Sequence, residues 1–83
     1  MNVTIKYFAS IREAIGQGSE ERETFAATLA ELRDELLVAS PAHAASLARG
    51  KAVRMALNQV MSRETALLAE GCEVAFFPPV TGG

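Results

Sequence analysis

The last two residues of the chain have the types and the position best suited to chemistry. Gly82 and Gly83 carry no side chain, so their backbone fits a channel too narrow for any Cβ atom. The carboxylate of Gly83 is also sterically open to attack. A free carboxylate is a poor acyl electrophile, but it becomes reactive once activated, for example as an acyl-adenylate. The pattern therefore predicts an acyl terminus that is delivered into the active site of another protein.

Two prolines form a stiff base for this terminus. Pro78 and Pro79 directly follow an apolar run, and proline lacks the N–H that a central strand requires. Each ring fixes φ, and Pro79 also biases Pro78 toward an extended backbone. We therefore predict a body of residues 1–77 and a projecting tail of residues 78–83, which reaches roughly 20 Å when fully extended. The alternative is a frayed chain end, because termini commonly carry small residues and are disordered.

The first 25 residues predict two strands joined by a helical turn. Apolar and polar residues alternate over residues 3–7, which is typical of a strand. This strand would turn Val3, Ile5 and Tyr7 toward the core and Phe8 toward the opposite face. Residues 10–15 predict a helical turn ended by residues 16–18, and the densely charged residues 21–25 predict a second strand.

A capping box marks the start of the main helix. Thr28 is followed three residues later by Glu31, which is the pattern of an N-cap with its reciprocal partner. An apolar stripe follows at helical spacing, made of Leu29, Leu32, Leu36 and Leu37. The helix is expected to run to about residue 39. Ser40 and Pro41 then favour a second short helix, which Gly50 closes.

The remaining residues predict three further strands. Residues 53–57 alternate, Asn58-Gln59 predicts a turn into a short strand over residues 60–62, and residues 73–77 form the last strand. Leu67 and Leu68 are expected to anchor the connection that Gly71 ends. A helix on one face of a mixed sheet is an α+β arrangement. It fits a ubiquitin-like β-grasp, with the first strand beside the last in the middle of the sheet.

Composition narrows the possible functions. The chain has 83 residues and a formal net charge of −2, with its basic residues spread along the sequence. It therefore lacks the basic footprint of non-specific nucleic-acid binding. No apolar run approaches the roughly 20 residues of a membrane span, and no signal peptide is evident, so we expect a cytoplasmic protein. A single cysteine, Cys72, and a single histidine, His43, exclude an internal disulfide, a Cys/His metal cluster and an iron–sulfur site.

Three stretches of sequence resemble a known family. They are VTIKYFA at residues 3–9 with Arg12 and Glu13, ALNQ at residues 56–59, and GCEVAFFPPVTGG at residues 71–83. The chain resembles the MoaD family, the small sulfur-carrier subunit of molybdopterin synthase, over its whole length. The third stretch is the most specific. Cys72 departs from the family pattern, which often has Asp there.

The resemblance implies a mechanism and its partners. A ubiquitin-activator-like enzyme uses ATP to adenylate Gly83, and a sulfur donor protein then supplies sulfur to form a thiocarboxylate. The carrier docks on the large subunit of the synthase, in a heterotetramer of two small and two large subunits. There it donates sulfur to cyclic pyranopterin monophosphate, and two donations form the molybdopterin dithiolene. The carrier itself binds no cofactor or metal and is not an enzyme alone.

Within this family a surface at Phe8, Met61 and Phe77 contacts the large subunit. Strand parity places Phe8 and Phe77 on the face opposite the helix, where exposed apolar patches often mark interfaces. Residues of the tail would contact the partner as well, namely Pro78, Pro79, Val80 and Thr81, while Gly82 grants passage to Gly83. The alternative is chance exposure or a one-residue slip, which would invert the faces.

Other residues carry weaker hypotheses. Cys72 lacks a basic neighbour in the sequence, and we interpret it as an inert small apolar residue. His43 has no evident partner, and we interpret it as a surface residue. Arg12 and Glu13 are expected on a solvated face, with a contact to the adenylating enzyme as an alternative.

Three other functions remain open from sequence. The chain could carry sulfur for another pathway, such as thiazole synthesis, because such carriers share the fold and the Gly-Gly end. It could be a protein modifier joined through Gly83 to lysines of its targets. It could also be a passive β-grasp binding module. No Ser-His-Asp set, phosphate loop or pair of acids is visible, so independent catalysis is not expected.

Overall fold

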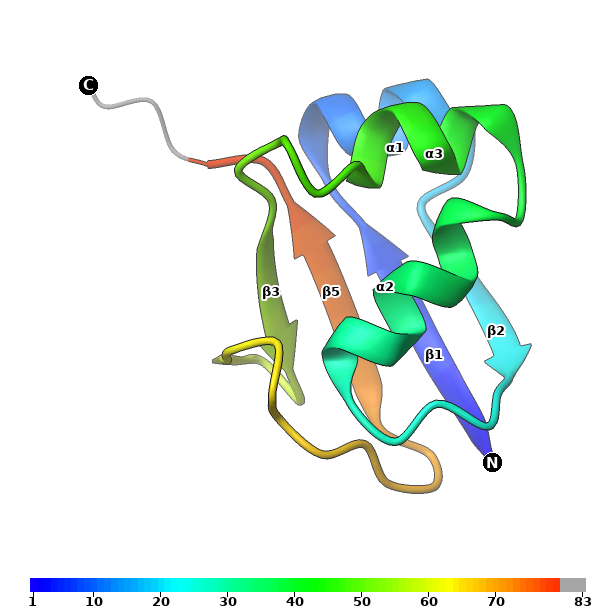
Figure 1. Cartoon of the computed structure of the whole chain (residues 1–83), viewed down its shortest axis with the longest axis vertical. Coiled ribbons are helices and arrows are strands. Elements are labelled where there is room, and N and C mark those ends of the chain that lie inside the picture. The colour runs from blue at the N-terminus through cyan, green and yellow to red at the C-terminus, as the bar shows by residue number, and fades with distance from the viewer. Residues whose placement is uncertain (80–83) are drawn as a thin grey trace.

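A five-stranded mixed sheet forms the centre of the computed structural model, which describes residues 1–79 (Figure 1). The strand order is β2-β1-β5-β3-β4. The first and last strands, β1 (Asn2–Tyr7) and β5 (Glu73–Phe77), are parallel neighbours. On the outer side of β1, β2 (Ser19–Glu23) pairs antiparallel with it. On the outer side of β5, β3 (Arg54–Leu57) pairs antiparallel with β5, and β4 (Val60–Met61) forms the edge of the sheet beyond β3. The predicted α+β class and the central pairing of first and last strands are both confirmed.

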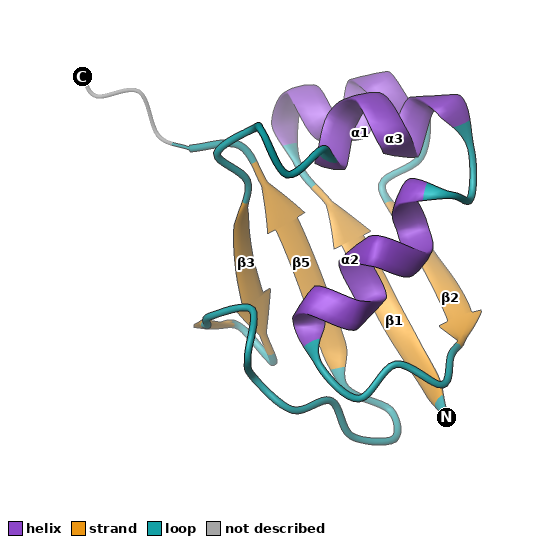
Figure 2. Ribbon diagram, viewed as in Figure 1, coloured by secondary structure: helices purple, strands orange, loops and turns teal. Residues whose placement is uncertain are grey.

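Among residues 1–79, three helices cover one face and one end of this sheet (Figure 2). The helix α2 (Leu29–Leu37) crosses the face. The two shorter helices, α1 (Ala9–Ile15) and α3 (Pro41–Leu47), lie together at the end where β1 and β5 both finish. The chain leaves the sheet at this same end, so α1 and α3 stand close to the base of the tail.

The core forms where α2 and the sheet face each other. Its fully buried members come from β1, α2, α3 and β5, and they are Val3, Ile5, Tyr7, Leu29, Leu32, Leu36, Leu47, Val74 and Phe76. The strand parity predicted from alternation is therefore correct for β1 and β5. The predicted leucine stripe of α2 is buried as well, except that Leu37 is only partly covered.

Local signals in the sequence set the helix starts. Thr28 Oγ1 accepts a hydrogen bond from the Glu31 N–H at 3.2 Å, as the capping box predicts. The Glu31 carboxylate accepts instead from the Ala27 N–H at 2.9 Å, one residue before the N-cap. Ser40 Oγ caps α3 through the His43 N–H at 3.1 Å, and Pro41 occupies the first turn.

Several predicted boundaries were wrong by a few residues. The second strand is residues 19–23 rather than 21–25, because Asn2 pairs with Glu23 and Lys6 with Ser19. Phe25 consequently lies beyond the strand and is 95% exposed. The helix α2 ends at Leu37, before the predicted residue 39, and α3 ends at Leu47, before Gly50. The strand β4 ends one residue before Ser62.

Leu67 and Leu68 were both predicted to anchor the connection before Gly71, but only Leu68 packs into the core. Leu68 is buried and its N–H donates to the Ala27 carbonyl at 2.9 Å. Leu67 is 73% exposed, because its pairing with Thr28 holds the segment extended and neighbouring side chains of an extended segment point in opposite directions.

The turn at Asn58-Gln59 is as predicted, with φ of 50° and 69°, the positive values that a two-residue hairpin turn requires.

Within residues 1–79, no helix combines the length and the apolar character that a bilayer crossing demands. The same residues contain no group of three or more His, Cys, Asp or Glu side chains arranged to hold a metal ion.

Candidate docking site at the end of the central strands

The base of the tail is held by the middle of the sheet. Phe77 ends β5, Pro78 is half-buried, and Pro79 is exposed. The Phe76 carbonyl accepts from the Phe8 N–H at 3.1 Å, which ties this end of β5 to the end of β1. Of the predicted site residues, Val80, Thr81, Gly82 and Gly83 lie outside the described part of the chain. Four residues span at most about 14 Å, so whatever holds Gly83 must approach the surface around Pro79.

Two phenylalanines form an apolar pair beside this base. The ring centroids of Phe8 and Phe77 are 6.3 Å apart at an interplanar angle of 85°, which is the favoured edge-to-face geometry. Phe8 is 46% exposed. Phe77 lies next to the buried Phe76, so it points to the open face of the sheet, away from α2. The structure therefore brings these two predicted residues together, as parity indicated.

Met61 extends the same open face toward the sheet edge. It pairs with Ala56, which in turn pairs with Ala75 of β5. Both alanines are buried, while Met61 is 53% exposed. We call Phe8, Phe77 and Met61, with the two alanines between them, the open-face patch. Arg54, the register partner of Phe77, borders the patch, and sequence reasoning did not single it out.

A cavity of about 300 Å³ opens on the other side of the tail base. It is lined by α1 residues Ser10, Ile11 and Ala14, by Ser46 of α3, by residues 51–53, and by Pro78 and Pro79. Ser46 is buried, and its Oγ has no hydrogen-bond partner among residues 1–79. Four separate stretches of sequence meet here, so no local pattern predicts the cavity.

Comparison with known proteins identifies the relatives of this chain. The ThiS family matches residues 5–83. The chain belongs to the ThiS family.

Full-length relatives refine this family assignment. The molybdopterin synthase sulfur carrier subunit of Escherichia coli (strain K12) is 37% identical over 98% of this chain and 99% of its own length. Among solved structures, SAMP1 from Haloferax volcanii has a TM-score of 0.79 at 26% identity, with both chains fully covered. A complex of subunits 1 and 2 of the molybdopterin-converting factor from Helicobacter pylori 26695 has a TM-score of 0.70 at 25% identity, also with full coverage of both chains. The recognised family and the ubiquitin-like fold are therefore confirmed.

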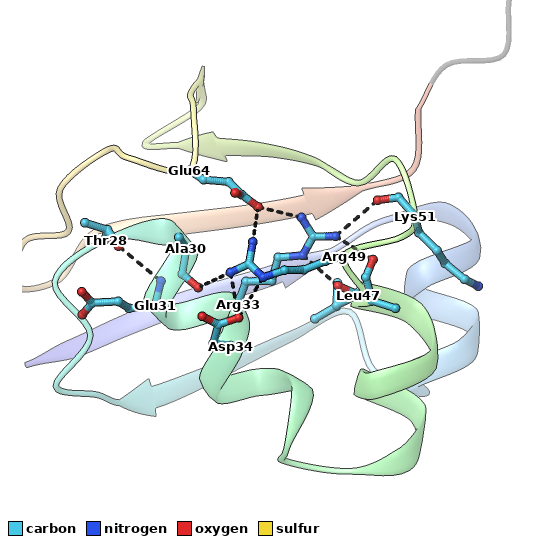
Figure 3. A network of polar contacts seen from close by, with 10 residues as sticks. Thr28, Ala30, Glu31, Arg33, Asp34, Leu47, Arg49, Lys51 and Glu64 are labelled. Carbon is cyan, nitrogen blue, oxygen red and sulfur yellow. Dashed lines mark hydrogen bonds and ion pairs between the residues drawn. The ribbon is translucent and has the colours of Figure 1, made fainter.

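In this ThiS-family chain, two arginines fix the segment that walls the cavity (Figure 3). The buried Arg33 of α2 donates to the carbonyls of Leu47, Ala48 and Lys51 at 2.7, 2.8 and 3.3 Å. Its Nη1 also donates to Glu64 Oε1 at 2.9 Å. These bonds hold residues 47–51 against α2. Residues 51–53, which line the cavity, begin at the last residue of this anchored segment.

Arg49 extends the same network at the surface. It donates to Asp34 Oδ1 at 2.7 and 3.0 Å, to the Ala30 carbonyl at 3.1 Å and to Glu64 Oε1 at 2.9 Å. Glu64 thus accepts from both arginines, as Figure 3 shows. Sequence reasoning missed both arginines, because their partners lie 14 or more residues away along the chain.

The interpretation of His43 as a surface residue was wrong. His43 is buried, with Nδ1 at 2.7 Å from Ser40 Oγ and Nε2 at 3.3 Å from Glu20 Oε2. The same Glu20 oxygen accepts from Tyr7 Oη at 3.1 Å. Ser40 Oγ already caps α3, so this Ser-His-Glu chain joins α3 to β2 and serves the fold. Glu20 is 23 residues from His43, which is why the sequence showed no partner.

Three other residues lie as the sequence indicated. Cys72 is a buried free cysteine within the core, which favours its interpretation as a small apolar residue. It follows Gly71, whose φ of 76° meets the requirement of a turn for a positive φ. Arg12 and Glu13 are both exposed on α1.

Proposed function

We propose that this chain is the sulfur carrier subunit of molybdopterin synthase and acts in the cytoplasm. The observation that carries the proposal is its 37% identity, over nearly the full length of both proteins, to a relative of that name. The geometry is compatible with it: the tail leaves the centre of the sheet beside an exposed apolar patch. On this proposal the body aims the terminus and Gly83 carries the sulfur.

The chemistry requires two activated forms of Gly83. In an adenylating enzyme, a carboxylate oxygen of Gly83 attacks the α-phosphorus of ATP and releases pyrophosphate. Hydrosulfide released by a sulfur donor protein then attacks the acyl carbon and AMP leaves, which produces the thiocarboxylate. ATP is thus a substrate of the partner enzyme, and the carrier needs no cofactor or metal of its own.

The second stage takes place in the large subunit. The thiocarboxylate sulfur attacks a carbon of cyclic pyranopterin monophosphate, and an oxygen substituent of that carbon leaves as the C–S bond forms. Water then cleaves the resulting acyl–sulfur bond, which leaves sulfur on the substrate and restores the carboxylate. Gly82 and Gly83 lack side chains, so the tail passes a narrow channel. The open-face patch, with residues 78–81, binds the large subunit in a heterotetramer of two small and two large subunits.

A protein modifier is the second candidate. SAMP1 from Haloferax volcanii has one of the higher TM-scores, 0.79, and a related structure is described as a small archaeal modifier protein. The fold therefore does not separate the two functions.

The alternatives differ in the products that they form. A modifier would become covalently attached to lysines of other proteins and give a ladder of bands on a gel, whereas a dedicated carrier would not. A carrier for thiazole synthesis would load with sulfur but would not support dithiolene formation, and a passive binding module would not be adenylated.

Intact mass measures the central step. Incubation with a competent adenylating enzyme, ATP and a sulfur source should raise the mass by the difference between one sulfur and one oxygen atom. A variant with one residue added after Gly83 should keep its fold and lose both this shift and synthase activity. An unchanged mass for the natural chain would exclude any carrier function. Full activity of the extended variant would exclude the role of Gly83.

A further inference from the structure

The chain carries few amines that could react with its own activated terminus. An acyl-adenylate forms an amide with a deprotonated amine that comes within reach of its acyl carbon. Only two of the eight basic side chains are lysines, Lys6 and Lys51, and the others are arginines, whose guanidinium group stays charged and is therefore no nucleophile. The acceptors that the chain offers to Gly83 are thus these two lysines and the amine of Met1.

Two of these three amines are held away from the tail. The Met1 amine donates to the Thr24 carbonyl at 3.0 Å, and it lies before the start of β1, at the opposite end of the sheet from the tail base (Figure 1). The Lys6 amine forms an ion pair with Glu73 at 3.4 Å. Glu73 begins β5, so this contact draws the Lys6 amine toward the end of β5 that is farther from Pro78.

The third amine, that of Lys51, belongs to the base of the tail. Lys51 is exposed, and it lines the cavity of about 300 Å³ together with Pro78 and Pro79. Its backbone is fixed, because its carbonyl accepts from Arg33 Nη2 at 3.3 Å and from the Val53 N–H at 2.9 Å. Its side chain points away from Arg33 (Figure 3). Among residues 1–79 the Lys51 amine forms no ion pair.

The length of the tail brings Gly83 within reach of this amine. The four residues after Pro79 span at most about 14 Å, and the four-carbon stem of lysine adds to the reach of the amine. Gly82 and Gly83 adopt turn conformations at no steric cost, so the terminus can turn back toward the cavity. A group joined to its reaction partner by a short linker has an effective concentration in the millimolar range, which favours this amine over those of other copies.

We propose that Lys51 is the acceptor of this chain's own activated terminus and forms an isopeptide bond with Gly83 when no sulfur is supplied. The inference rests on the proposed function, because that function supplies the acyl-adenylate. The deprotonated Nζ of Lys51 attacks the acyl carbon of Gly83, AMP leaves with the electron pair of the broken C–O bond, and the nitrogen releases one proton to water. The product has no terminal carboxylate, so it is not adenylated again and is withdrawn from sulfur transfer.

Incubation of the full chain with the adenylating enzyme and ATP, without a sulfur source, tests the proposal. The intact mass should fall by one water molecule, and the product should run as a single chain on a denaturing gel. Trypsin does not cleave after an acylated lysine, so digestion should give a branched peptide that joins residues 50–54, through Lys51, to residues 64–83. A sulfur source should lower the yield, because hydrosulfide attacks the same acyl carbon.

Two matched variants identify the acceptor. Lys51→Arg keeps the positive charge and removes the nucleophilic amine, so it should abolish the dehydrated product. Lys6→Arg makes the same exchange at the ion-paired lysine and should leave the yield unchanged. Both variants should still release pyrophosphate from ATP, because adenylation takes place at Gly83.

The outcomes separate this inference from the proposed function. The inference is overturned if the natural chain gains sulfur but gives no dehydrated product in the sulfur-free reaction. It is also overturned if the branch maps to Lys6 or Met1, or if the product has the mass of two chains. In each of these cases a gain of sulfur in the parallel reaction leaves the carrier function standing. If a competent adenylating enzyme releases no pyrophosphate with the natural chain, the proposed function fails and this inference fails with it.

Discussion

A single carboxylate, that of Glu20, joins a cluster of polar side chains from β1, α3 and the start of β2. Glu20 Oε2 accepts from Tyr7 Oη at 3.1 Å and from Gln17 Nε2 at 2.8 Å, and it lies 3.3 Å from His43 Nε2. The rings of Tyr7 and His43 meet edge to face at 5.7 Å. Burial, followed by the charge of Glu20 and the hydrogen bond to it, holds the pKa of Tyr7 well above its ordinary value.

This arrangement predicts a loss of stability at alkaline pH that depends on one residue. In the unfolded chain Tyr7 ionises near pH 10, whereas the buried phenol stays protonated. The unfolded state therefore binds fewer protons above that pH, and the free energy of unfolding falls by up to about 1.4 kcal/mol per pH unit until the folded pKa is reached. Tyr7→Phe should lower stability near neutral pH by roughly 1.5–3 kcal/mol, the value of a hydrogen bond to a charged group, but should remove this extra alkaline slope.

Urea unfolding at neutral pH and at two alkaline pH values measures both effects. Tyr7 is the only tyrosine in the chain, so tyrosinate absorbance reports its ionisation directly. Equal alkaline slopes in the natural chain and in Tyr7→Phe would show that the phenol ionises alike in the folded and unfolded states.

At the scale of elements, α2 illustrates which contacts can be predicted from a sequence and which cannot. Its N-cap joins Thr28 to Glu31 over three residues, and such local pairs are readable as motifs. Arg33, in the same helix, binds the carbonyls of Leu47, Ala48 and Lys51. These partners become neighbours only after α3 has folded back against α2, so the sequence alone gave no reason to expect a buried arginine.

The Arg33 anchor should contribute more to stability than its exposed counterpart. Arg33→Met leaves several carbonyl groups without their donor and removes one of the two donors of Glu64, and we expect a loss of about 3 kcal/mol in the free energy of unfolding. Arg49→Met is the matched control, because its side chain and that of Asp34 are largely exposed. Exposed pairs typically contribute at most about 1 kcal/mol. Urea unfolding of both variants measures the difference, and equal losses would refute the anchoring role of Arg33.

At the scale of the whole molecule, alternation along the strands predicted the two faces of the sheet correctly. Val74 and Phe76 are buried against α2, while Ala75 and Phe77 point to the open face. This pattern is local and has a period of two residues. The strand order does not follow from periodicity, and its prediction came from the β-grasp fold that the order of helix and strands fits.

The remaining features depend on contacts between distant segments. The cavity at the tail base, the Glu20 cluster and the position of β2 each require the sheet register or the placement of α3. Phe25 shows the consequence: a shift of the strand by two residues turned an expected strand residue into an exposed loop residue. The candidate site could therefore be predicted at Phe8 and Phe77, but the cavity could not, because its lining comes from four separate stretches of the chain.

The two adjacent phenylalanines of β5 allow folding and docking to be separated within one strand. Phe76 is fully buried, so Phe76→Ala should cost about 3–5 kcal/mol of stability. That is a large share of the roughly 5–15 kcal/mol that holds a domain together. Phe77→Ala should cost only about 0.5–1.5 kcal/mol of stability, because it loses mainly the edge-to-face contact with Phe8.

Phe77→Ala should nevertheless weaken binding to the large subunit at least about tenfold if the open-face patch is an interface hot spot. Thermal unfolding and calorimetric binding of the two variants measure the ranking. A Phe77→Ala protein that is strongly destabilised yet binds with natural affinity would return this residue to the core and leave the open face without a docking role.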